Sequence, residues 1–405
     1  MTKHKRMALW LLLALLFFVL TPSVILYSQG YRVDWKSKRI VQTGALYFKI
    51  VPTRTDILVD GKILKTTDFF FGSALIGNIF PGPHHIQISK AGYQSWAKQL
   101  EIQEKQVTNA KNIILFPQNP EFSTAADHVE QVWKTPKENT LLLQKITPEK
   151  TWKLTLLNLA TMGEETIFSS KGKEQLLNII WNPSGTKILL SLTNGENIRY
   201  FIFSIQKGQS CNVSPCYLAF LGDTLDIIMF SPISDDQVVF TKPIRNMLIL
   251  QEANYTKKEI IASSGYNIVT FTIIGSKLLW LESDGKLWER NMQTQNPGHI
   301  ISSLPYSVKQ ETEYDIYAVG DVLFLKEGIS LLQIDTQEKK MKEIFSDVHV
   351  STGSPDNTKL AIINGSEIWI LYLQDSQDQP NHKTGDKVFL TRLSKALDNL
   401  SWIGT

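Results

Sequence analysis

A strand–turn–strand phrase recurs along most of this chain and limits the folds that the chain can adopt. Its clearest copy spans residues 179–192, where Trp181-Asn182-Pro183 and Gly185 separate two apolar runs. Pro and Gly reverse the direction of the backbone, so each copy predicts a hairpin of two strands. The turn positions lie 35–49 residues apart, at Pro136, Pro183, Pro232, Gly275, Gly320 and Pro355.

Further apolar strands follow the hairpins, as at residues 199–203, 285–288 and 367–372. A repeated unit of four strands, roughly 40–50 residues long, is typical of β-propeller blades, and propellers commonly present binding surfaces. The phrase around Trp181 and its copy at residues 354–357 resemble the blade repeat of TolB-type and WD40-like propellers. We therefore predict a mainly β protein in which residues 118–405 form a β-propeller with six visible repeats.

A seventh unit begins at residues 399–405, where Trp402 takes the position that Trp181 has in its repeat. We expect the chain to be truncated within this seventh blade, because residues 129–133 already supply the matching strand of the first blade. The alternative is a last strand that closes the ring by pairing into the first blade. An incomplete ring would leave an unpaired sheet edge.

The N-terminal region predicts a membrane anchor. Residues 7–27 carry no charge, and about 20 apolar residues span a bilayer as a helix. The basic residues of the 1–6 tail favour a cytoplasmic N-terminus, although Arg32 and residues 36–39 place further basic side chains on the other side. The alternative is a signal peptide cleaved after Ser28 or Gly30. We predict an uncleaved, single-pass signal anchor in the cell membrane, with these anchor residues: Met7, Trp10, Leu15, Phe18, Leu20 and Tyr27.

A connecting segment at residues 28–43 leads to a block of short strands at residues 44–117. Residues 46–50 alternate between core and solvent positions, and Asp60-Gly61 is a hairpin-turn dipeptide. The order of the block resembles the PEGA domain, through residues 59–62, 80–82, 89–96 and 113–117. Pro52-Thr53-Arg54-Thr55 replaces the sequence that gives this family its name. The resemblance implies a small β-sandwich that serves bacterial surface proteins as a spacer or adhesion-type module, without catalytic residues.

An aromatic run lies within this block, at Phe69, Phe70 and Phe71 with Leu75 and Ile76. One interpretation is a buried strand with its packing partners. The other is an exposed apolar patch that docks the next domain or a partner.

The remaining candidate residues and motifs do not indicate an enzymatic reaction. Cys211 and Cys216 are close enough in sequence to close a small loop disulfide in an oxidising compartment, or else they are two free thiols. The sequence holds no Gly-x-Ser-x-Gly elbow, no Walker A loop and no His-Glu-x-x-His motif, so we expect no enzyme, cofactor or metal. A formal charge of +3 over 405 residues gives no case for nucleic acid.

The sequence therefore predicts a membrane-anchored, extracytoplasmic binding or scaffold protein of the bacterial envelope. Its propeller is expected to interact with a protein or an envelope polymer, an interpretation that rests on fold analogy. The alternatives are a propeller enzyme acting on glycans or peptides and a purely structural envelope spacer.

Overall fold

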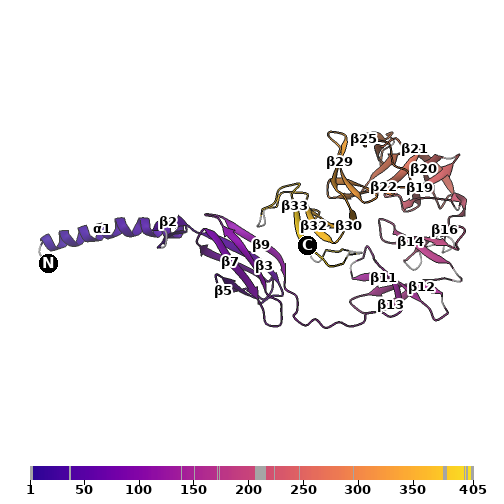
Figure 1. Cartoon of the computed structure of the whole chain (residues 1–405). Helices are drawn as coiled ribbons and strands as arrows, with labels where there is room; N and C mark the ends of the chain where they lie inside the picture. Colours follow the sequence, from indigo (N-terminus) through magenta and orange to yellow (C-terminus); the bar gives the residue numbers. More distant parts are fainter. Residues whose placement is uncertain are drawn as a thin grey trace.

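The computed structural model describes residues 3–35, 38–137, 139–149, 151–170, 172, 174–205, 216–222, 224–245, 247–294, 296–376, 381–395, 397 and 400–402. The chain is mainly β, with one apolar helix at the N-terminal end of the described part. Helix α1 (Lys3–Ser28) leads into a hairpin of β1 (Tyr31–Asp34) and β2 (Arg39–Gln42). Figure 1 shows the sandwich beyond the end of this helix and the propeller beyond the sandwich.

Two β-sheets, made mainly of antiparallel strand pairs, form the sandwich. One sheet has the order β6-β3-β9 and the other β5-β4-β7-β8. Strands β3 and β9 pair in parallel, and the other pairs are antiparallel. The bounds are β3 (Gly44–Val51), β4 (Asp56–Val59), β5 (Lys62–Thr66), β6 (Ser73–Ile79), β7 (Gly82–Ser89), β8 (Trp96–Ile102) and β9 (Val107–Ile114).

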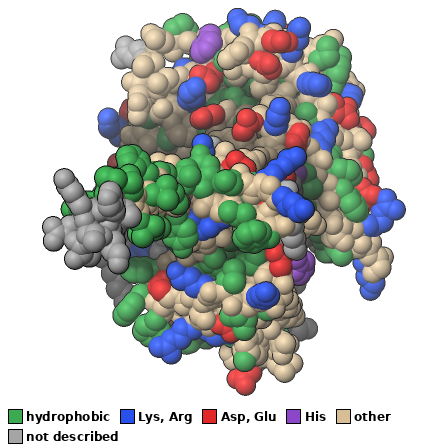
Figure 2. Space-filling model, turned by 90° about the vertical axis from the view of Figure 1, so that its left-hand side faces the viewer, with side chains coloured by type: hydrophobic (Ala, Val, Ile, Leu, Met, Phe, Trp, Pro, Cys, Tyr) green, Lys and Arg blue, Asp and Glu red, His purple; other side chains and the backbone are tan. Residues whose placement is uncertain are grey.

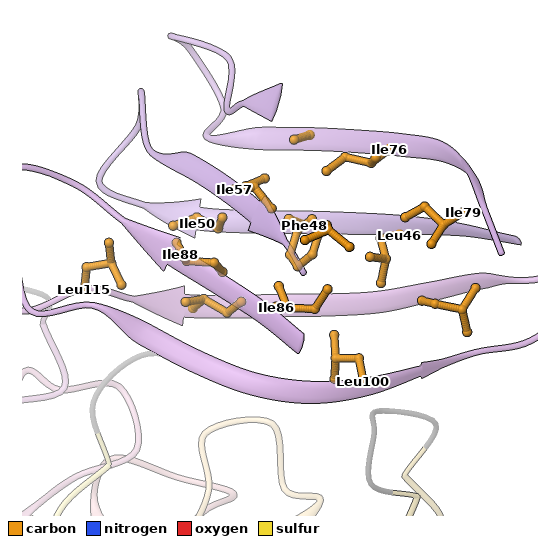
Figure 3. Packing of buried hydrophobic residues seen from close by; sticks show 14 residues of the cluster. Leu46, Phe48, Ile50, Ile57, Ile76, Ile79, Ile86, Ile88, Leu100 and Leu115 are labelled. Atoms are coloured by element: carbon orange, nitrogen blue, oxygen red, sulfur yellow. The ribbon is translucent and has the colours of Figure 1, made fainter. Parts of the chain in front are cut away.

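The predicted alternation in β3 is confirmed. Leu46, Phe48 and Ile50 are fully buried, while the residues between them point away from the core. Figure 3 shows these side chains between the two sheets, facing Ile57, Ile86 and their neighbours from the opposite sheet. The sandwich therefore has a hydrophobic core of its own.

In the described part of the chain, six four-stranded antiparallel units follow, each built from consecutive strands, as in propeller blades. A parallel bridge between Ser303 and Lys340 joins the fourth and fifth units into one eight-stranded sheet. Blades I to III are β10 (Val129–Lys134), β11 (Thr140–Ile146), β12 (Trp152–Asn158), β13 (Glu164–Ser169); β14 (Gln175–Trp181), β15 (Lys187–Thr193), β16 (Ile198–Ser204), β17 (Cys216–Tyr217); and β18 (Ile228–Phe230), β19 (Gln237–Ile244), β20 (Met247–Asn254), β21 (Glu259–Tyr266). Blades IV to VI are β22 (Ile268–Ile274), β23 (Lys277–Glu282), β24 (Lys286–Asn291), β25 (His299–Ser303); β26 (Tyr314–Val319), β27 (Val322–Glu327), β28 (Ser330–Asp335), β29 (Lys340–Phe345); and β30 (Val348–Gly353), β31 (Lys359–Asn364), β32 (Glu367–Tyr372), β33 (Lys387–Arg392).

Neighbouring blades share hydrophobic clusters. The second strand of each blade is an apolar run buried on both faces, because it lies between two neighbours. In β19, Val238 and Phe240 pack in a cluster with blade II, whereas Val239 between them packs with blade IV. The period-2 geometry of the strand thus divides one apolar run between two blade interfaces.

The seventh unit is described only in part. Trp402 Nε1 donates a hydrogen bond of 3.0 Å to the carbonyl oxygen of Thr352 in β30, so Trp402 lies against blade VI. Residues 398–399 and 403–405 lie outside the described part of the chain. Truncation and ring closure both remain predictions.

Candidate membrane anchor and binding surfaces

Helix α1 exposes apolar side chains along its length. Its most hydropathic stretch, Trp10–Ser28, has 19 residues and none of it is buried against the rest of the chain. At 1.5 Å per residue this stretch is about 28 Å long, close to the thickness of a bilayer core. The predicted anchor residues are all exposed: Met7, Trp10, Leu15, Phe18, Leu20 and Tyr27.

Two serine hydroxyls of this helix find partners within it. Ser23 Oγ donates to the Val19 carbonyl oxygen at 2.7 Å, and Ser28 Oγ donates to the Ile25 carbonyl oxygen at 2.8 Å. Internal partners of this kind suit a helix in hydrocarbon, where no water is present to replace them. The helix has the length and composition to span a membrane, and a signal sequence has the same features.

The phenylalanine turn (Phe69–Phe71) lies between β5 and β6 and is held by one carboxylate. Asp68 accepts hydrogen bonds from the backbone N–H of Phe70 and Phe71, and from the backbone N–H and hydroxyl of Ser73. These bonds, first that of the Ser73 hydroxyl, lower the pKa of Asp68 to about 2. Gly72 has a φ of +63° and lies against the Ile50 backbone, where a side chain has no room.

The phenylalanine turn is exposed, not a buried strand. Phe70 and Phe71 are 80% and 77% exposed, and the Arg54 guanidinium lies 4.2 Å from the centroid of the Phe69 ring. Leu75 is exposed as well. The interpretation as a buried strand is wrong for these three phenylalanines, because the Asp68 hydrogen bonds fix a turn at the rim of the sandwich.

Ile76 does not belong to this exposed surface. Its side chain is 7% exposed and packs in the core of the sandwich, as Figure 3 shows. Ile76 neighbours Leu75 in β6, and successive side chains of a strand point to opposite faces. The predicted patch is therefore corrected to the phenylalanine turn with Leu75.

The cysteine pair falls partly outside the described residues. Cys216 is half-buried in β17, and Cys211 lies in the part of the chain that the structure does not describe. The disulfide between them stays a prediction.

A pocket of about 390 Å³ opens between blades I and II. Trp181 lines it together with Lys137, Asn158, Glu164 and Glu165. An aromatic ring beside an amide, a cation and two carboxylates can stack on a ligand and hydrogen-bond to it. Trp181 also packs against the hydrophobic cluster of blades I and II, and its place in a pocket depends on the neighbouring blade.

One hydrogen-bonded cluster around a glutamate belongs to the scaffold. Glu327 accepts hydrogen bonds from the hydroxyls of Tyr306 and Tyr314 and from the Lys309 ammonium, at 2.6–3.0 Å. With its carboxylate oxygens paired in this way, Glu327 fastens the loop before β26 to β27. Within the described ranges, no group of three or more His, Cys, Asp or Glu residues has a metal-binding arrangement.

Comparison with protein-family models found no match, and comparison with curated proteins also found none. Solved structures with a similar fold include the tricorn protease, at 10% identity and a TM-score of 0.44, covering 76% of this chain and 34% of that one. An acylaminoacyl peptidase from Pyrococcus horikoshii is similar at 10% identity and a TM-score of 0.41, covering 71% of this chain and 46% of that one. The Swd1 β-propeller domain of Myceliophteria thermophila is similar at 12% identity and a TM-score of 0.40, covering 60% of this chain and 83% of that one.

The chain thus spans about a third of the tricorn protease and less than half of the peptidase. Its own topology, with six consecutive four-stranded units, defines a multi-blade β-propeller preceded by one apolar helix.

Proposed function

We propose that this chain is a single-pass membrane protein of the bacterial cell envelope, whose sandwich and propeller lie outside the cytoplasm. The observation that carries the proposal is the serial arrangement of an exposed apolar helix, a sandwich at its end and a propeller beyond (Figure 1). Figure 2, seen from the side toward which α1 projects, shows hydrophobic side chains gathered on one part of the face and mixed charges elsewhere.

The sequence supports this orientation and setting. Lys3, Lys5 and Arg6 precede the helix, which favours a cytoplasmic N-terminus. The resemblance of residues 44–117 to the PEGA domain, and of the blade repeat to TolB-type propellers, supports a bacterial surface protein. In this arrangement the propeller presents one binding surface, and the sandwich is a spacer that also carries the exposed phenylalanine turn.

The partner that we propose is a protein or an envelope polymer. The pocket at Trp181 supports a polymer, because its flat ring and polar neighbours suit stacking on a sugar-like unit. The phenylalanine turn supports a protein, because exposed rings on a fixed turn lose little entropy on binding.

The anchor is tested by expressing the full-length chain with a C-terminal tag. We expect the intact mass in the membrane fraction after an alkaline wash, and digestion of the tag by protease added outside spheroplasts. A soluble chain that begins after Ser28 or Gly30 would instead establish a cleaved signal peptide.

The binding surface is tested with detergent-solubilised full-length chain and purified cell-wall polymer. Trp181→Leu keeps an apolar side chain and removes the flat ring, so we expect binding to fall several-fold. Trp369→Leu, a half-buried tryptophan of blade VI, is the matched control. Equal binding by wild type and Trp181→Leu would contradict a polymer site at this pocket.

A further inference from the structure

The hairpin that follows α1 exposes apolar side chains that no other described residue covers. Val33 in β1 pairs directly with Ile40 in β2, so both side chains lie on the same face of the two-stranded sheet. Val33 is 46% exposed and Ile40 is 65% exposed. Trp35 follows β1 in the turn and is 84% exposed. An isolated hairpin is at best marginally stable in water, and this one leaves its larger side chains uncovered.

The hairpin is fastened to the end of the helix. Arg32 donates to the Tyr27 carbonyl oxygen at 2.8 Å, and its guanidinium lies 3.7 Å from the centroid of the Tyr27 ring. Gln42 Nε2 donates to the Gln29 carbonyl oxygen at 2.7 Å, and the Thr43 N–H donates to the Gly30 carbonyl oxygen at 3.0 Å. Both strands of the hairpin are therefore tied to the C-terminal residues of α1 and the turn that follows.

The same arginine joins the hairpin to the sandwich. Arg32 Nη2 donates to Asn78 Oδ1 in β6 at 2.8 Å. Arg32 pairs with Val41, on the opposite face from Val33 and Ile40. The face that carries Arg32 and Val41 thus contacts the helix end and the sandwich. Val33 and Ile40 lie on the other face, where Gln42, nearer to the helix, reaches Gln29.

The position of the hairpin matches the boundary of a bilayer. The apolar stretch of α1 ends at Ser28, so the hairpin begins where the hydrocarbon ends. Trp and Tyr favour the interface between hydrocarbon and water. The hairpin sequence also carries four basic residues against Asp34 alone, namely Arg32, Lys36, Lys38 and Arg39. Basic residues next to a membrane are attracted to anionic lipids.

We propose that this hairpin lies in the headgroup layer of the leaflet facing the sandwich, with Val33, Trp35 and Ile40 inserted among anionic phospholipids. The inference rests on the proposed function, since it needs α1 to remain in the membrane. Lys38 and Arg39, which are exposed and weaken the orientation signal, then serve as headgroup contacts. The hairpin and Arg32 hold the sandwich at a fixed height above the bilayer.

The test uses the full-length chain with both cysteines changed to serine, reconstituted into vesicles of phosphatidylcholine and phosphatidylglycerol. Ile40→Cys and, separately, Val33→Cys carry a spin label. Phe70→Cys is the control, because Phe70 is also exposed, at 80%, but lies beyond the Val51 end of β3, whereas the Gly44 end joins the hairpin. We expect labels at 40 and 33 to collide several-fold less with a water-soluble nickel chelate than the label at 70, and more with oxygen.

The outcomes separate this inference from the anchor itself. Labels at 40 and 33 that are as accessible to the chelate as the label at 70, on a chain that floats with the vesicles, would overturn the hairpin proposal and leave the anchor intact. A chain that does not float would overturn both. Replacing phosphatidylglycerol with phosphatidylcholine should raise the chelate collisions at 40, and no change would overturn the role of anionic headgroups.

Discussion

Asn182 shows how one side chain of the repeated turn serves both its own hairpin and the next blade. Its Oδ1 accepts from the N–H groups of Thr186 and Lys187, at 2.9 and 2.7 Å. Its Nδ2 donates to Asp235 Oδ1 of blade III at 2.8 Å. The side chain is almost fully buried, so water cannot replace these partners.

The first prediction concerns this residue. Asn182→Ala removes the acceptor of two part-buried N–H groups and one of the two side-chain donors to the Asp235 carboxylate, the other being Ser184, which should destabilise the propeller by about 1–3 kcal/mol. Urea unfolding at neutral pH measures the change. Asn194→Ala is the control, because Asn194 also accepts from two N–H groups but in an exposed turn, where water can replace it. Equal losses in the two variants would show that burial and the blade contact add nothing.

The second prediction concerns pH and Glu327. Burial raises the pKa of Glu327, but hydrogen bonds from Tyr314, Tyr306 and Lys309 lower it by more, so the folded pKa lies below the ordinary value. The stabilisation is therefore present above the unfolded pKa of about 4.3 and is lost as pH falls through the lower folded pKa. We expect Glu327→Gln to be less stable at neutral pH and to lose less stability on acidification, measured by urea unfolding across a pH series.

Glu313 is exposed, so Glu313→Gln serves as the control and should keep the wild-type acid dependence.

At alkaline pH, Tyr314 contributes a pKa shift of the opposite sign. Burial first, then the hydrogen bond to Glu327, raises the pKa of Tyr314 to about 12. This contribution is present below the unfolded pKa of about 10 and is lost as pH rises toward 12. On the acid side, a wild-type pH profile in Glu327→Gln would contradict the assignment of acid-dependent stability to the Glu327 carboxylate.

At the scale of elements, turns and strands depend on different forces. The second strand of each blade is held by apolar packing from both sides, as in β19. The phenylalanine turn has no such cover, and its conformation depends on the hydrogen bonds to Asp68. A turn that is held by hydrogen bonds can display apolar side chains without packing them against the core.

The third prediction therefore concerns the turn. Asp68→Ala removes the acceptor, so the amides of Phe70 and Phe71 should exchange hydrogen several-fold faster, while those of β3 stay protected. Hydrogen exchange with mass spectrometry measures both segments. Ser73→Ala, which removes only the hydroxyl donor, should give a smaller effect. Unchanged exchange in the turn of Asp68→Ala would mean that Asp68 does not hold it.

At the scale of the whole molecule, sandwich and propeller have separate hydrophobic clusters joined by a segment without strands at residues 118–128. Phe122 in this segment is 90% exposed. Exposed segments of this kind are preferred sites of proteolysis. The fourth prediction follows from this arrangement.

Brief chymotrypsin treatment of the membrane-bound chain should cleave first after Phe122. It should leave α1 and the sandwich in the membrane and yield a propeller fragment that begins at residue 123, identified by its mass. Phe122→Ser should slow this cut several-fold. First cleavage within a blade or within the sandwich would contradict the division into two folded units.

Local sequence is sufficient to predict the features that depend on neighbouring residues. The apolar helix, the alternation in β3 and the first hairpin of each blade follow from local hydrophobic periodicity and turn residues, and the structure confirms them. Tertiary structure alone decided that Ile76 is buried beside an exposed Leu75, that Trp181 lines a pocket, and that Asn182 reaches Asp235, 53 residues away. These features depend on which surface faces which neighbour, and packing between distant segments sets that choice.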